Sequence, residues 1–149
     1  MVPLVNSSPT GLLNVGNTCY VNSLLQTYVQ LPLFRERILG FRPSPATWQD
    51  LEELKAMDLP RLRTQLSNAD NTDADNKKEF QKFASLRFVH QLQRLFATMI
   101  RGNQSYVDPT RVLNSLVDEK GDVVRVGNQE DASGKELDSS RFHFPLATL

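Results

Sequence analysis

The feature that most constrains the fold is a long apolar stripe in the second half of the chain. Large apolar residues recur there every three or four positions, the spacing that places side chains on one face of an α-helix. The stripe consists of Phe83, Leu86, Val89, Leu92, Phe96 and Met99. Gly102 follows it, and glycine is common just beyond the end of a helix. The sequence therefore predicts one long helix that faces a core and ends at Gly102.

Two shorter helices are expected near the start of the chain. A segment rich in turn-forming residues precedes Cys19, and apolar residues at helical spacing follow it, so a helix is expected to open at Cys19. Pro32 divides it from a shorter helix that includes Ile38. Another short helix is expected over 48–57. Residues 67–76 are almost wholly polar and are predicted to form an inserted loop.

The last helical signal lies near residue 110. Asp108 followed by proline is typical of an N-cap with proline in the first turn, which predicts a helix through residues 112–116. Strand signals are confined to short pieces such as 123–126. The local patterns thus predict a mainly α fold.

Composition limits the chain to one modest domain and excludes some classes of binding partner. Of its 149 residues, 40% are hydrophobic, and 17 basic residues balance 17 acidic ones. This balance argues against a broad electrostatic contact with nucleic acid or anionic lipid. A single cysteine excludes an intramolecular disulfide, and no apolar run has the length needed to cross a membrane. We therefore expect a cytoplasmic or nuclear protein that binds neither nucleic acid nor membranes.

The residues around Cys19 suit acyl-transfer chemistry. A cysteine on the first turn of a helix lies near unpaired backbone N–H groups and the positive end of the helix dipole, both of which favour a thiolate. Gly11 and Gly16 permit a tight, left-handed backbone just upstream. Asn14, five positions before the cysteine, offers an uncharged amide that can donate to an oxyanion. The same pattern is also compatible with a small, buried, inert cysteine, which is the more common role of a lone cysteine.

The order of the residues around Cys19 helps to distinguish a catalytic cysteine from an inert one. Residues 11–26 read Gly-Leu-Leu-Asn-Val-Gly-Asn-Thr-Cys-Tyr-Val-Asn-Ser-Leu-Leu-Gln, which resembles the cysteine box of ubiquitin-specific proteases position after position. The resemblance implies hydrolysis of the bond after the C-terminal glycine of ubiquitin, with Cys19 as nucleophile and Asn14 as oxyanion donor. It also implies a papain-like α+β cysteine protease fold, of which this chain holds the helical, thumb-like N-terminal portion.

A second stretch, residues 127–133, resembles the second box of the same family. Within it, Gln129 and Asp131 correspond to positions that contact the basic tail of ubiquitin. The alternative is a helix start in which Asn128 is the N-cap and the acidic residues favour the first turn. Because this stretch follows the cysteine box in the family's order, the resemblance favours tail binding.

The family's catalytic imidazole has no match in the sequence. His90 lies at the edge of the apolar stripe, where a boundary position is expected. His143 lies between two phenylalanines, without the Gly-His-Tyr setting typical of the family. Zinc-ligand cysteine pairs are also absent from the sequence, so no metal and no cofactor are expected. The fold is therefore predicted to be incomplete.

The resemblance covers residues 9–133, apart from the polar insert at 67–76. Residues 134–149 depart from the family pattern, beginning with Gly-Lys-Glu, which the codons GGT-AAG-GAG can encode. Because this DNA would contain a typical intron start, our hypothesis is that 134–149 is a non-homologous tail from intron read-through.

The sequence thus predicts a truncated thiol-dependent deubiquitinase, weakly active or inactive as it stands. Its expected partners are ubiquitin and ubiquitinated proteins. The main alternative is a non-catalytic fragment that binds ubiquitin or regulates its turnover, in which Cys19 is incidental. A helical interaction domain with a coincidental resemblance is a third interpretation.

Overall fold

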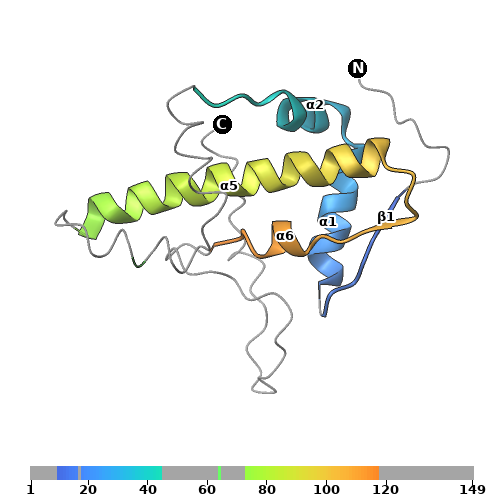
Figure 1. Ribbon diagram of the computed structural model, residues 1–149, viewed down its shortest axis with the longest axis horizontal. Helices are drawn as coiled ribbons and strands as arrows, with labels where there is room; N and C mark the ends of the chain where they lie inside the picture. The colour runs from blue at the N-terminus through green and yellow to red at the C-terminus, as the bar shows by residue number, and fades with distance from the viewer. Residues whose placement is uncertain (1–9, 17, 45–63, 65–72, 118–149) are drawn as a thin grey trace.

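A long helix forms the axis of the molecule in the computed structural model, which describes residues 10–16, 18–44, 64 and 73–117. In chain order the elements are β1 (Gly11–Leu12), α1 (Cys19–Gln30), α2 (Pro32–Gly40), α5 (Asp73–Arg101), β2 (Tyr106–Val107) and α6 (Thr110–Leu113). Figure 1 shows α5 crossing the whole view, with α2 on one side of it and α6 on the other. The described fold is mainly α, as the sequence predicts.

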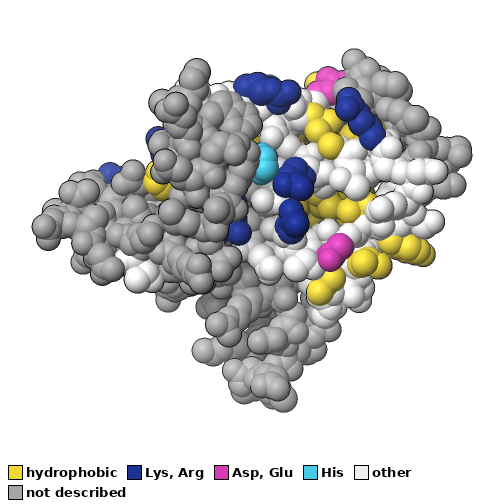
Figure 2. All heavy atoms as spheres, viewed as in Figure 1, with side chains coloured by type: hydrophobic (Ala, Val, Ile, Leu, Met, Phe, Trp, Pro, Cys, Tyr) yellow, Lys and Arg dark blue, Asp and Glu magenta, His cyan; other side chains and the backbone are white. Residues whose placement is uncertain are grey.

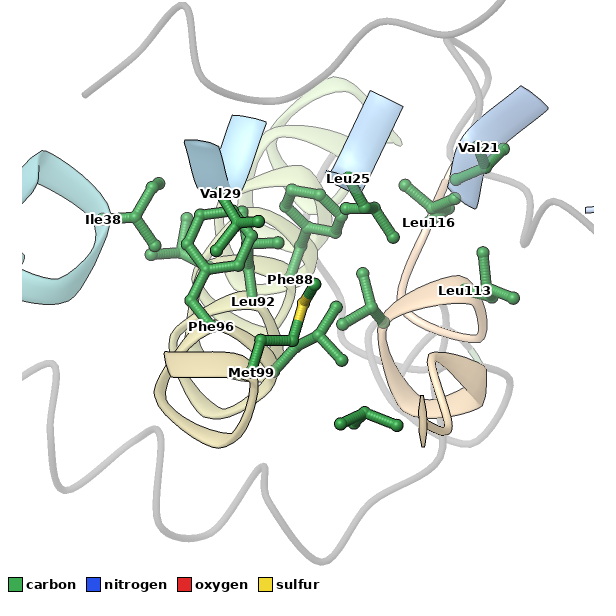
Figure 3. Close-up of a cluster of buried hydrophobic side chains, with 14 of the residues drawn as sticks. Val21, Leu25, Val29, Ile38, Phe88, Leu92, Phe96, Met99, Leu113 and Leu116 are labelled. Atoms are coloured by element: carbon green, nitrogen blue, oxygen red, sulfur yellow. The ribbon is translucent and has the colours of Figure 1, made fainter. Parts of the chain in front are cut away.

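The core lies where α5 meets α1, α2 and α6. Of the predicted stripe on α5, Val89, Leu92, Phe96 and Met99 are buried in this core, whereas Phe83 and Leu86 are only half-buried. Phe88, which the prediction did not include, is buried there as well. Leu25 and Val29 of α1 project into the same cluster, as Figure 3 shows. Burial of these apolar side chains is the main contribution to the stability of the helical unit.

The corner between α1 and α2 is held by both polar and aromatic contacts. Arg35 is buried on α2, and its Nη1 donates a hydrogen bond of 2.8 Å to the carbonyl oxygen of Val29 in the last turn of α1. The ring of Phe34 stacks on Tyr28 at a centroid distance of 4.6 Å and meets Phe96 of α5 edge-on. These contacts fix the turn at Pro32, where the sequence predicts the break between the two helices.

A short parallel sheet joins the start of the described chain to the segment after α5. Gly11 pairs with Tyr106 and Leu12 with Val107. A Cβ atom added at Gly11 would lie 2.8 Å from the Tyr106 ring, so this glycine permits a close approach between the two strands. The left-handed backbone predicted for this segment occurs at Gly16 and not at Gly11. The sequence did not predict the pairing of β1 with β2.

Two predicted boundaries are corrected by the structure. The polar insert was expected to extend to residue 76, but α5 already begins at Asp73. The helix after Asp108 was expected to continue through Leu116, whereas α6 ends at Leu113 and Leu116 is buried beyond it. By contrast, α5 ends at Arg101, next to Gly102 as predicted.

Other predictions fall outside the described residues. They concern the helix at 48–57, the strand at 123–126 and the tail at 134–149. Within the described ranges, none of the helices has an apolar stretch long enough to cross a membrane.

Candidate active site

Cys19 occupies the first position of α1, where the sequence predicts it, and its side chain is exposed. The α1 helix runs from this residue into the core, so its N-terminal end lies at the surface (Figure 1). At this end of a helix, backbone N–H groups have no acceptor within the helix itself. The thiol is therefore open to a substrate at a place where N–H donors gather.

A tight turn that includes residues 13–16 and Thr18 brings Asn14 next to the start of α1. Thr18 is fully buried, and its hydroxyl group accepts a hydrogen bond of 3.2 Å from the backbone N–H of Val15. The same hydroxyl donates to Oδ1 of Asn14 over 3.0 Å. Gly16 makes the turn possible with a φ of 72°, a backbone conformation that L side chains rarely adopt. The two predicted catalytic residues, Asn14 and Cys19, are thus linked through Thr18.

Two side-chain amides of α1 attach this turn and β1 to the helix. Asn22 Nδ2 donates to the carbonyl oxygen of Leu13 over 3.0 Å, and Gln26 Nε2 donates to that of Thr10 over 3.0 Å. Asn22 and Gln26 are four residues apart and hence lie on the same face of α1. The other edge of β1 is held by β2, because Leu13 N–H donates to the carbonyl oxygen of Val107. The turn that carries Asn14 is therefore fixed from both sides.

Exposed apolar side chains occur on the turn before Cys19 and directly after it. Tyr20, next to Cys19, is 53% exposed, and Leu13 and Val15 of the turn are also exposed. Figure 2 shows hydrophobic side chains reaching the surface over the region of β1 and β2, where Tyr106 is exposed as well. Exposed apolar side chains gathered around a reactive group are typical of a surface that a partner covers.

The other predicted site residues are not brought to this turn. His90 is half-buried in the middle of α5, the boundary position that the sequence predicts. In the part of the chain that the structure describes, no histidine contacts the Cys19 thiol, and no cluster of metal-ligating residues occurs. Gln129, Asp131 and His143 lie outside the described residues.

Sequence reasoning missed Thr18, Asn22 and Gln26. A threonine at an N-cap position is expected to cap its own helix, yet the Thr18 hydroxyl makes no such bond and is directed to the turn instead. For the two amides a signal was available, because polar residues at positions i and i+4 on a helix share one face. Their acceptors, the carbonyl groups that flank β1, could not be predicted from local pattern.

Comparison with known proteins identifies the family. The sequence model of the family described as "Ubiquitin carboxyl-terminal hydrolase" matches residues 10–134, which include both Cys19 and Asn14. This chain belongs to the ubiquitin carboxyl-terminal hydrolase family. The family's domain has a papain-like fold, and the described helices agree with a helical N-terminal portion of it.

Individual members of the family support the assignment. The chain is 30% identical to Ubiquitin carboxyl-terminal hydrolase 2 of Saccharomyces cerevisiae over 111 residues, which are 72% of this chain and 8% of that protein. It is 30% identical to human Ubiquitin carboxyl-terminal hydrolase 28 over 112 residues, which are 75% of this chain and 8% of that protein. A salmon relative, Ubiquitin carboxyl-terminal hydrolase 12 of Salmo salar, is 27% identical over 133 residues, which are 89% of this chain and 32% of that protein. The chain thus matches less than a tenth of the length of the first two.

Proposed function

We propose that this chain is part of a thiol-dependent deubiquitinase that hydrolyses the bond after the C-terminal glycine of ubiquitin. One observation carries the proposal: the exposed thiol of Cys19 lies at the first residue of α1, beside a turn that holds an asparagine amide. Membership of the hydrolase family supplies the expected substrate class, which is ubiquitin joined to other proteins.

The proposed chemistry uses the two ends of the turn. Sγ of Cys19 attacks the carbonyl carbon of the terminal glycine of ubiquitin, and the carbonyl π electrons move to its oxygen. The side-chain amide of Asn14 donates a hydrogen bond to that oxyanion, together with N–H groups at the start of α1. Collapse of the intermediate expels the amine and leaves a thioester, which water then hydrolyses. Gln129 and Asp131 are proposed to contact the basic tail of ubiquitin.

Turnover also requires a base that removes the thiol proton and later protonates the leaving amine. In the described ranges no imidazole contacts Cys19, so the residues that are described supply the nucleophile and the oxyanion donor but not this base. We therefore expect the 149-residue chain to capture activated ubiquitin much more readily than it hydrolyses an isopeptide bond.

The test is covalent capture. The chain is incubated with ubiquitin that carries a thiol-reactive electrophile in place of its C-terminal carboxylate, and adducts are counted by intact mass. We expect one adduct on the wild-type chain and none on Cys19→Ala. The matched control is the same electrophile on a Gly-Gly dipeptide. Equal rates with ubiquitin and with the dipeptide would contradict the proposal, because the thiol would then react without recognising ubiquitin.

A second candidate function is ubiquitin binding without turnover. The observation that favours it is the exposure of the apolar side chains Leu13, Val15 and Tyr20, which lie near Cys19 in the sequence. Titration of isotope-labelled ubiquitin with Cys19→Ala, followed by NMR, measures binding alone. Binding by Cys19→Ala with no adduct on the wild-type chain would favour this alternative over hydrolysis.

A further inference from the structure

Thr18 is buried, whereas the described residues on either side of it are exposed. Asn14, Val15 and Gly16 are all exposed, and so is Cys19, whereas Thr18 has no exposed surface. A buried hydroxyl group needs hydrogen-bond partners, because leaving it unpaired destabilises the folded state. Thr18 finds both partners within the turn and makes no capping bond to α1.

The two hydrogen bonds of Thr18 have a fixed direction. The backbone N–H of Val15 can only donate, so it occupies a lone pair of the Thr18 hydroxyl oxygen. The single hydroxyl proton is directed to Oδ1 of Asn14. The oxygen and the NH₂ group of a carboxamide are bonded to one planar carbon, so anchoring Oδ1 also fixes the direction of the Asn14 NH₂ group and leaves both of its N–H donors free of Thr18.

The backbone beneath these bonds is also held in place. Gly16 turns the chain back on itself, which brings Thr18 to the side chain of Asn14. Asn22 holds the carbonyl group of Leu13, the residue before Asn14, against α1. An exposed asparagine would otherwise rotate among several rotamers. Here the orientation of its amide is set before a substrate arrives.

We propose that Thr18 is a positioning residue for the reaction of Cys19, acting through Asn14. It fixes the orientation of the Asn14 carboxamide, whose NH₂ group then donates to the oxyanion. This inference rests on the proposed function. Removing an oxyanion donor outright lowers kcat by roughly 10²–10³. Losing only its orientation leaves the donor present but mobile, so the expected loss is smaller, about tenfold.

The test compares two reactions of the same thiol. Ubiquitin with a C-terminal aldehyde forms a hemithioacetal: the Sγ thiolate bonds to the aldehyde carbon, and the carbonyl π electrons move to the oxygen, which becomes an oxyanion before it takes up a proton from the solvent. Iodoacetamide alkylates Sγ and expels iodide without forming an oxyanion. The ratio of aldehyde affinity to alkylation rate therefore reports the oxyanion donor and corrects for changes in the thiol itself.

Two variants distinguish the effect of the Thr18 hydroxyl group from the effect of its side-chain shape. Thr18→Val keeps the branched side chain and loses the hydroxyl, whereas Thr18→Ser keeps the hydroxyl and loses the methyl group. We expect Thr18→Val to lower the ratio by about tenfold, and Thr18→Ser to restore it to within about twofold of the wild-type chain. Adding Thr18→Val to Asn14→Ala should change nothing further, because the group through which Thr18 acts is gone.

The other possible results overturn either the inference about Thr18 or the proposed function. Equal ratios for Thr18→Val and the wild-type chain overturn the inference, and so does an equal loss in Thr18→Ser, which would indicate packing. If the wild-type chain captures no aldehyde, the proposed function itself fails, and the role of Thr18 fails with it. Thermal unfolding of each variant checks its fold. If Thr18→Val does not fold, Thr18→Ala against Thr18→Ser provides the same comparison.

Discussion

The helical core and the turn before α1 are built from opposite kinds of interaction. The core of α5, α1, α2 and α6 depends on buried apolar side chains such as Phe88 and Phe96, whose attraction has no preferred direction. The turn exposes most of its residues and depends on directed hydrogen bonds from Thr18 and Asn22. We therefore expect the core to determine whether the molecule folds, and, under the proposed function, the turn to determine whether the reacting groups are aligned. Mutations that damage one region while sparing the other test this division.

The largest effect is expected from a cavity in the core. Phe96 is fully buried and meets the ring of Phe34 edge-on, so Phe96→Ala should lower the free energy of unfolding by about 3–5 kcal/mol. Urea denaturation followed by circular dichroism measures the change. The matched control is Lys82→Ala, an exposed position on the same helix, which should stay within about 0.5 kcal/mol of the wild-type chain. If Phe96→Ala lowers the free energy of unfolding by less than about 1 kcal/mol, α5 is not the centre of the core.

A backbone change in the turn should cost less. Gly16 has a φ of 72°, and an L residue in left-handed backbone costs about 1–2 kcal/mol, so Gly16→Ala should destabilise by that amount. Gly40, at the end of α2, has open space where a Cβ atom would lie. Gly40→Ala should therefore be neutral or stabilise by up to about 1 kcal/mol. Thermal unfolding compares the two, and a similar change in both would contradict a strained backbone at Gly16.

The side-chain contact between α1 and the turn should have a smaller and more local effect. Asn22→Ala removes the bond to the carbonyl of Leu13, but it also removes Oδ1, a buried acceptor without a hydrogen-bond partner in the described part of the chain. The two changes partly offset each other, so we expect a loss of only about 1 kcal/mol. Amide hydrogen exchange should nevertheless accelerate at Val15 and remain unchanged in the middle of α5.

The control for this prediction is the next residue. Ser23→Ala removes an exposed bond to the carbonyl of Cys19 on the same helix and does not touch the turn. Exchange at Val15 should be the same as in the wild-type chain. If Asn22→Ala and Ser23→Ala behave alike, Asn22 does not hold the turn.

The division between the two regions also explains how far the sequence could predict the molecule. Helix boundaries at Cys19, Pro32 and Gly102 were predicted because periodicity, proline and glycine act locally. The start of α5 was placed too late, since the residue types of 73–76 suit a loop and the first turn of a helix equally well.

The contacts of the turn were less accessible to sequence reasoning. Pairing of Gly11 with Tyr106 joins residues far apart in the chain, and no local pattern encodes it. The family resemblance predicted Asn14 and Cys19 as site residues, yet local rules would assign Thr18 to capping α1. Its actual bonds depend on the turn at Gly16 folding back toward it. Directed contacts of this kind become visible only in three dimensions.

The smallest expected effect concerns Asp108, a residue far from Cys19 in the sequence that also makes directed hydrogen bonds. Its carboxylate accepts hydrogen bonds from the hydroxyl and the backbone N–H of Thr110, and these bonds, helped by Arg111, hold the pKa of Asp108 below its usual value of 3.8. A carboxyl group with a lowered pKa in the folded state stabilises the fold above its unfolded pKa. That contribution is lost as the pH falls from about 4 through the folded pKa.

Two variants isolate this contribution. Asp108→Ala should lower the free energy of unfolding by less than about 1 kcal/mol at pH 7, and its difference from the wild-type chain should shrink below about pH 4. Asp108→Asn keeps an oxygen acceptor that does not titrate, so its own stability should not show the loss that the carboxylate causes in this range. A difference between Asp108→Ala and the wild-type chain that stays constant down to pH 3 would mean that the bonds to Thr110 do not distinguish the charged carboxylate from the neutral acid. The start of α6 would then depend, like the core, on burial of Val112 and Leu113 and not on a directed polar contact.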